Sequence, residues 1–158
     1  MMIRTIVVAA VAAVAAALPG SVAAQAPSWS PEQTAVWTVV TQSWADEAAE
    51  NGRWPGGYVH DGVVAWDASW PLPRYKATIE KWTRFSDAQR QILQYELTPA
   101  AITIAGDTAV VHYATVTVSQ RAADAPKREM SSSIETLVRS GGTWKFLSLS
   151  SFELGKDD

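Results

Sequence analysis

The feature that most constrains the fold is an uninterrupted run from Thr108 to Ser119, "TAVVHYATVTVS". It is rich in β-branched residues, which favour strands. Successive side chains of a strand point to opposite faces, so the run predicts His112 on one face and Tyr113 on the other. A strand of this length needs neighbours on both sides. The chain is therefore expected to build a sheet around it.

Other segments of the second half have the same character, and turn signals separate them. Glycine-containing turns are predicted at Ala105-Gly106-Asp107 and at Ser140-Gly141-Gly142-Thr143, and a polar hairpin loop at 121–127. Together these signals predict an antiparallel meander. The further strands are expected at Ala101–Ile104, Glu129–Arg139 and Trp144–Phe152.

The first half of the chain predicts helices. Ser30-Pro31-Glu32-Gln33 is a strong helix start, with Ser30 as cap and Gln33 completing a capping box. Apolar residues follow at a spacing of four, and Asn51-Gly52 is expected to end this helix. A second helix is predicted over Pro73–Arg84, and Ser86-Asp87-Ala88-Gln89 is expected to open a short third one. Helices followed by a meander indicate an α+β fold.

The N-terminus predicts a secretory signal peptide over residues 1–24. Arg4 precedes a short apolar run, Pro19-Gly20 breaks it, and small residues allow cleavage near Ala24. The alternative is an uncleaved membrane anchor. The expected organisation is a tail at 25–29, a single domain over 30–153 and a tail at 154–158. The mature protein is expected to be secreted or periplasmic, with no further membrane association.

Composition and motifs exclude several classes of function. The net charge is −3 and no basic run stands out, so nothing indicates nucleic acid. The chain has no cysteine and only two histidines, His60 and His112, too few for an ordinary zinc site. Nucleotide-binding glycine motifs and the serine-nucleophile motif are missing. No metal and no cofactor are expected.

The order of these segments resembles a known family. "AITIAGDTAVVHY", "ETLVRSGGTWKFLS" and the stretch from Trp66-Asp67 to Pro73-Arg74 are similar to the nuclear transport factor 2-like superfamily, in its SnoaL-like and ketosteroid-isomerase-like branch. The resemblance covers about residues 30–152. It implies a cone-shaped curved antiparallel sheet wrapped around the N-terminal helices, a homodimer formed through the sheet, and a mostly apolar pocket.

The stretch from Trp54 to Lys76 is expected to line the mouth of that pocket. The resemblance implies that Asp67 is a general base, because ketosteroid-isomerase-like members carry one in this region. Desolvation between Trp66 and Trp70 would raise the pKa of such a carboxyl group. The alternative is a turn-forming aspartate. Trp66, Trp70 and Trp82 are expected to contact the ligand, whereas Trp44 and Trp144 are expected in the core.

The remaining candidates are His112 and Tyr113 for catalysis and Arg74, Glu135 and His60 for ligand binding. For His112, a structural role in the sheet or at a dimer interface is favoured over catalysis, and Tyr113, on the opposite face, is the better pocket candidate if His112 faces a partner subunit. Arg74 could pair with Asp67 or remain a surface residue. Glu135 alternates with Leu137, so it is expected to point inward and to need a partner such as Arg74 or His112. His60 is expected at the start of a loop, which it orients by hydrogen bonds.

Two functions fit these expectations. The first is an exported protein that binds a small apolar or amphipathic molecule in an aromatic-lined cone. The second is a cofactor-free isomerase, dehydratase or cyclase that uses Asp67 as its base. A structural dimer with a collapsed pocket is a third possibility. The sequence shows a pocket lining without a complete acid–base pair, which favours binding.

Overall fold

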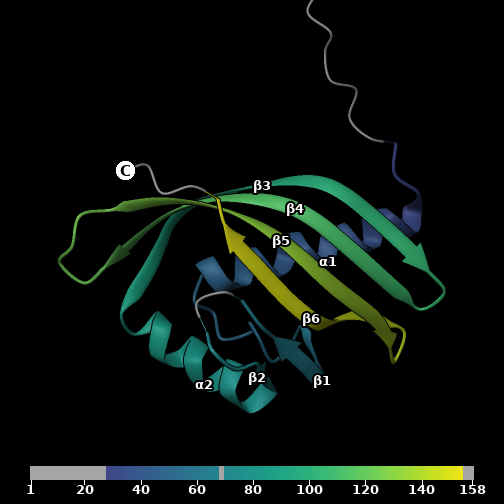
Figure 1. Cartoon of the computed structure of the whole chain (residues 1–158), viewed down its shortest axis with the longest axis horizontal. Helices are drawn as coiled ribbons and strands as arrows, with labels where there is room; N and C mark the ends of the chain where they lie inside the picture. The colour runs from purple at the N-terminus through teal and green to yellow at the C-terminus, as the bar shows by residue number, and fades with distance from the viewer. Residues whose placement is uncertain (1–27, 68–69, 155–158) are drawn as a thin grey trace, which may run out of the picture.

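The computed structural model describes residues 28–67 and 70–154 (Figure 1). The predicted signal peptide, residues 1–24, lies outside the described residues, as do most of the two predicted tails. Among the helices that the structure describes, none is long and apolar enough to cross a membrane.

The first helix, α1 (Pro31–Ala48), begins as the sequence predicts. The Ser30 hydroxyl accepts a hydrogen bond from the Gln33 amide at 3.2 Å, and the Ser30 amide donates to the Gln33 side chain at 2.9 Å. These two bonds satisfy amides that a helix start otherwise leaves without partners. Val36 and Val40 are fully buried, which fixes the face that α1 presents to the sheet.

Six strands form one mixed sheet in the order β2-β1-β6-β5-β4-β3. Strands β3 to β6 pair antiparallel, which confirms the predicted meander. Strand β1 joins the sheet parallel to β6, which the sequence did not predict. The remaining elements are β1 (Val59–Ala65), β2 (Arg74–Tyr75), α2 (Lys76–Asp87), β3 (Arg90–Ala105), β4 (Thr108–Arg121), β5 (Lys127–Ser140) and β6 (Thr143–Glu153).

The predicted third helix is wrong. Helix α2 ends at Asp87, and the chain enters β3 at Arg90, so the strand expected at 101–104 is only the end of a much longer one. The register of β3 shifts between Ile92 and Gln94 and again between Pro99 and Ala101. Such bulges interrupt the alternation that marks a strand in a sequence.

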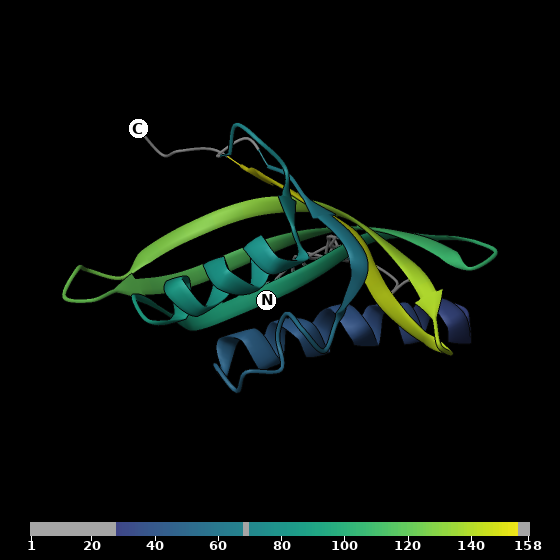
Figure 2. The same cartoon turned by 90° about the horizontal axis from the view of Figure 1, so that it is seen from below.

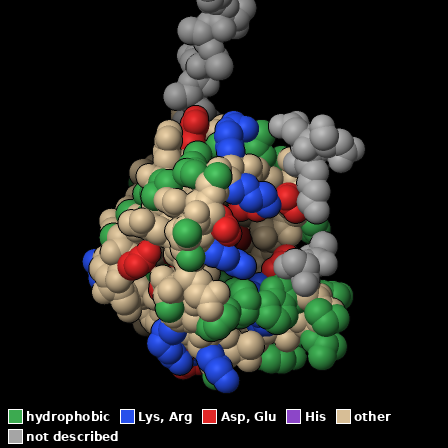
Figure 3. Space-filling model, turned by 90° about the vertical axis from the view of Figure 1, so that its left-hand side faces the viewer, with side chains coloured by type: hydrophobic (Ala, Val, Ile, Leu, Met, Phe, Trp, Pro, Cys, Tyr) green, Lys and Arg blue, Asp and Glu red, His purple; other side chains and the backbone are tan. Residues whose placement is uncertain are grey.

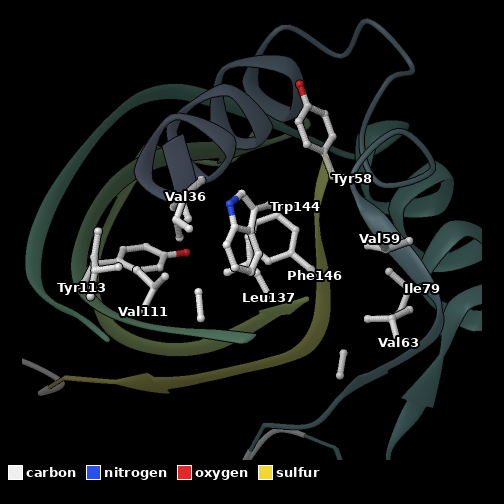
Figure 4. Packing of buried hydrophobic residues seen from close by; sticks show 14 residues of the cluster. Val36, Tyr58, Val59, Val63, Ile79, Val111, Tyr113, Leu137, Trp144 and Phe146 are labelled. Carbon is white, nitrogen blue, oxygen red and sulfur yellow. The ribbon is translucent and has the colours of Figure 1, made fainter. Parts of the chain in front are cut away.

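The sheet curves around both helices, as Figures 1 and 2 show, and confirms the α+β, cone-like expectation. Burial alternates along β4, with Val111 and Tyr113 buried on the inner face and His112 half-buried on the outer face. Figure 4 shows Leu137 and Phe146 packed inside the cone opposite Val36. Burying a large apolar side chain in this way stabilises the folded state by about 1.5–3 kcal/mol. The inner face therefore carries the core and leaves room for a cavity at one end.

Candidate functional site

A cavity of about 300 Å³ lies between the inner face of the sheet, α1 and α2. Figure 3 shows one face of the molecule hollowed, with acidic and basic side chains around the opening. A second, more open hollow of about 510 Å³ shares Trp44, Asp67, Arg90 and Ser151 with the cavity. The charged and aromatic side chains that line the cavity are Trp44, Glu47, Trp54, Asp67, Arg74, Trp82, Asp87, Arg90, Tyr113 and Glu135.

A chain of hydrogen bonds links three of these side chains. The Trp44 indole Nε1 donates to the Tyr113 hydroxyl at 3.0 Å, and the Tyr113 hydroxyl donates to Glu135 Oε1 at 2.8 Å. Figure 4 shows the Tyr113 hydroxyl pointing into the interior of the cone. Glu135 is 8% exposed, and its Oε2 has no hydrogen-bond partner among the described residues. A buried carboxyl oxygen without a partner is costly in a core and is typical of a site that binds something.

Burial keeps two of the cavity carboxyl groups, those of Glu135 and Glu47, protonated at unusually high pH. It raises the pKa of Glu135 to about 8, and nearby Glu47 raises it further, although the bond from Tyr113 acts in the opposite direction. Burial also raises the pKa of Glu47 to about 7, against the lowering effect of the Arg90 charge. Burial and the adjacent Glu135 raise the pKa of Tyr113 as well, so its hydroxyl stays protonated. The cavity thus holds two carboxyl groups that titrate close to neutral pH.

Asp67 lines the cavity, but as one half of an ion pair. Its Oδ2 accepts a hydrogen bond from Arg74 at 2.6 Å, and both side chains are mostly buried. The Arg74 guanidinium also lies over the Trp70 ring, 4.7 Å from its centroid. Arg74 belongs to β2 and not to the start of a helix as expected, because α2 begins only at Lys76. Of the two interpretations of Arg74, the pairing with Asp67 is the one observed.

Of the three tryptophans expected to contact the ligand, only one lines the cavity. Trp82 lines it, and the Trp70 and Trp82 rings meet edge to face at 4.9 Å. Trp70 and Trp66 are not among the described residues that line the cavity, and Trp66 is 58% exposed. Trp44, expected in the core, packs against it and also lines the cavity, whereas Trp144 is buried in the core as expected.

The two histidines lie outside the cavity. His112 is on the outer face of β4, opposite Ile134 of β5, and its Nδ1 is buried without a partner among the described residues. It therefore cannot pair with Glu135, whose partner is Tyr113. His60 lies within β1 and not in a loop, and its Nδ1 accepts a hydrogen bond from the Gly62 amide at 3.0 Å. In the part of the chain that the structure describes, no group of His, Asp and Glu side chains is arranged to hold a metal ion.

The sequence interpretation missed three charged residues of the cavity, Glu47, Asp87 and Arg90. Glu47 follows Trp44 by three positions on α1, so helical spacing places both on one face and could have indicated it. Arg90 opens β3, where a helix was expected, and no sequence signal pointed to it. Its Nε is also buried without a partner among the described residues.

Comparison with solved structures identifies the fold. A ketosteroid isomerase-like protein from Erwinia carotovora superposes with a TM-score of 0.71 at 11% identity, over 81% of this chain and 100% of that one. The chain has the nuclear transport factor 2-like fold. An NTF2-like protein from Cytophaga hutchinsonii gives a TM-score of 0.69 at 13% identity, over 79% and 100% of the two chains. ActVI-ORFA from Streptomyces coelicolor gives 0.65 at 13% identity, over 78% and 98%.

Sequence comparison adds nothing to this result. No family model matches the chain, and no curated protein matches it. At identities this low, the structural likeness establishes the nuclear transport factor 2-like fold and not a shared activity.

Proposed function

We propose that this protein binds a small amphipathic molecule in the cavity of its cone, with Tyr113 and Glu135 as the polar anchor. The observation that carries the proposal is Glu135 Oε2, which is buried at the cavity wall without a partner in the described structure. A bound ligand would supply that partner. A concave cavity in which a few polar groups converge is also the usual form of a small-molecule site.

Part of the cavity lining is aromatic or aliphatic and can take an apolar part of a ligand. Trp54, Trp82 and Ile79 belong to the lining, and Trp44, another lining residue, stacks on Tyr95. A volume of about 300 Å³ corresponds to a small ligand, at the lower limit of typical pockets. The ligand is therefore expected to place its apolar part among the indole rings and its polar group at Glu135.

A second candidate function is proton transfer, because two carboxyl groups with pKa values of about 7 and 8 share one cavity. A general acid or base works best when its pKa is close to the working pH. Glu135 suits this role better than Asp67, because Arg74 is paired with the Asp67 carboxylate. The similar protein from Erwinia carotovora is described as ketosteroid isomerase-like, which is compatible with this alternative.

The test begins with the protein as the cell makes it. Native mass spectrometry, followed by organic extraction, should find a small molecule with wild-type protein and much less with Glu135→Gln or Tyr113→Phe. Asp61→Asn is the matched control, since Asp61 is 92% exposed on its side chain and lies outside the cavity lining. A molecule that remains bound equally to all variants would contradict the proposal that Tyr113 and Glu135 anchor the ligand.

The same extract separates binding from catalysis. Incubation with wild-type protein should leave the molecule unchanged if the protein is a carrier, and should convert it if the protein is an enzyme. In the second case, Glu135→Gln is expected to abolish turnover and Asp67→Asn to reduce it less. The reverse order would return the role of base to Asp67.

We also propose that the protein is exported through residues 1–24 and forms a homodimer through the outer face of its sheet. Support for the dimer comes from apolar side chains on that face: Ile134 of β5 is 42% exposed and Phe152 of β6 is 47% exposed. N-terminal sequencing of the mature protein tests the export proposal, which requires a start near Gln25.

A further inference from the structure

Acidic side chains outnumber basic ones around the cavity. Its lining holds four carboxylic side chains and two guanidinium groups: Glu47, Asp67, Asp87, Glu135, Arg74 and Arg90. Arg74 pairs with Asp67 at 2.6 Å. Arg90 acts on Glu47, since its charge lowers the pKa of that carboxyl group. Arg74 is thus paired with Asp67, and the charge of Arg90 acts on Glu47, whereas no cation is among the causes that shift the pKa of Glu135.

Glu135 has no cation beside it within the described structure. Its one hydrogen-bond partner is the neutral Tyr113 hydroxyl, and no described Lys or Arg forms an ion pair with it. A buried carboxylate is stable only when a cation or several hydrogen bonds compensate its charge. Glu135 therefore remains protonated in the empty cavity, with Oε2 unpartnered.

The aromatic side chains of the lining suit a cation as well. Trp44, Trp54, Trp82 and Tyr113 all contribute to the cavity wall. The faces of such rings attract ammonium groups, and several rings around one cavity are a known means of holding them. The adjoining open hollow adds two carboxylates, Glu129 and Glu153, of which Glu129 pairs with Lys127 at 2.7 Å.

We propose that the natural ligand carries a protonated amine on an apolar body, and that Glu135 is its counter-ion in the cavity. This inference rests on the proposed function, since it names the class of ligand that the same cavity takes. The ammonium group lies at Glu135 Oε2, and the apolar body lies among the indole rings of Trp54 and Trp82. Tyr113 holds the carboxylate in place through its bond to Oε1.

Binding of such a ligand is coupled to release of a proton. The Glu135 carboxyl group keeps its proton up to a pKa of about 8 in the empty protein, and a bound ammonium group favours the ionised form. The proton leaves to solvent, and the ligand keeps its own. Affinity is therefore expected to rise with pH from about 5 to about 8. The other ionisable groups that share the cavity with Glu135 are Tyr113, Glu47, Asp87, Arg90, Asp67 and Arg74.

The experiment compares phenethylamine with its neutral counterpart, phenethyl alcohol, by isothermal titration calorimetry at about pH 7. The amine should bind about tenfold more tightly than the alcohol. Repeating the titration in two buffers with different ionisation enthalpies should show release of close to one proton with the amine and none with the alcohol. The proton count uses wild-type protein and does not depend on how any variant folds.

Variants of the protein test whether Glu135 causes the tighter binding of the amine and the release of a proton. Glu135→Gln should bring amine affinity down to that of the alcohol and abolish proton release, with Asp61→Asn behaving as wild type. The inference is overturned if the alcohol binds as well as the amine, if no proton is released, or if neither probe binds. The first of these outcomes would leave the small-molecule cavity intact and remove only its preference for cations. Extraction of a bound neutral molecule would likewise overturn the preference for cations and leave the small-molecule cavity intact.

Discussion

Tyr113 of β4 donates a hydrogen bond of 2.8 Å to Glu135 of β5 across the inner face of the sheet. The register explains why the two side chains meet: Tyr113 pairs with Ser133 and Val111 with Glu135, so both point into the cone as diagonal neighbours. The same pair stands at the wall of the cavity.

Glu135→Gln is expected to stabilise the protein at high pH. The folded-state pKa of Glu135 is raised from 4.5 to about 8, so the folded protein holds a proton that the unfolded chain loses earlier. Stability therefore falls as pH rises between these values, by on the order of 5 kcal/mol, and then levels off. Glutamine has no charge to bury, so the variant should lack this loss.

Urea unfolding of wild type and Glu135→Gln at a series of pH values measures this difference. The free energies of unfolding of the two proteins should diverge between about pH 5 and pH 8, in favour of the variant. Curves that stay parallel over that range would show that Glu135 ionises normally.

Tyr113→Phe is expected to lower the free energy of unfolding by about 1–3 kcal/mol, because it leaves both the Trp44 indole and the Glu135 carboxyl group without their partner. It should also raise the pKa of Glu135 further, since the bond from Tyr113 lowers that pKa. Tyr95→Phe is the control, because Tyr95 stacks on the same Trp44 and makes no hydroxyl bond to a described residue. An equal loss of stability in both variants would argue against the hydrogen-bond chain.

The sequence could predict the inner face of β4 and β5 because alternation along these strands is regular. It placed Tyr113 and His112 on opposite faces and Glu135 on the same face as Leu137, which the structure confirms. It could not identify the partner of Glu135, because that depends on the register between strands. The parallel pairing of β1 with β6 joins segments far apart in the chain and leaves no local pattern.

Asp46→Asn is expected to destabilise the protein at neutral pH. Asp46 is buried at the end of α1 and accepts hydrogen bonds from Tyr58, from Asn51 at 2.8 Å and from Gln42 at 3.2 Å. The bond from Tyr58 is the main reason that its pKa is lowered below 3.8. This stabilisation is present above pH 3.8 and disappears as pH falls through the lowered pKa.

Thermal unfolding as a function of pH tests the role of Asp46. The difference in Tm between wild type and Asp46→Asn should be largest at neutral pH and should shrink in strong acid. Asp61→Asn should change little at any pH, since its ion pair with Lys76 is exposed. A difference for Asp46→Asn that did not depend on pH would rule out this explanation.

Ile134→Glu is expected to convert the proposed homodimer into a monomer, since it puts a charge at the centre of the outer sheet face, opposite His112. Sedimentation equilibrium measures the change. Phe85→Glu, on the exposed side of α2, is the matched control and should remain dimeric. A wild-type protein that is monomeric at all concentrations would contradict the dimer.

The most direct test of the site is a carbon-13 NMR titration of the glutamate side-chain carboxyl groups, with Glu135 and Glu47 assigned through their Gln variants. A cavity with an uncompensated buried carboxyl group requires Glu135 to titrate at about 8 and Glu47 at about 7. Phenethylamine should then move the Glu135 titration to lower pH. A Glu135 carboxyl group that titrates at its ordinary value of 4.5, with or without the amine, would contradict the account.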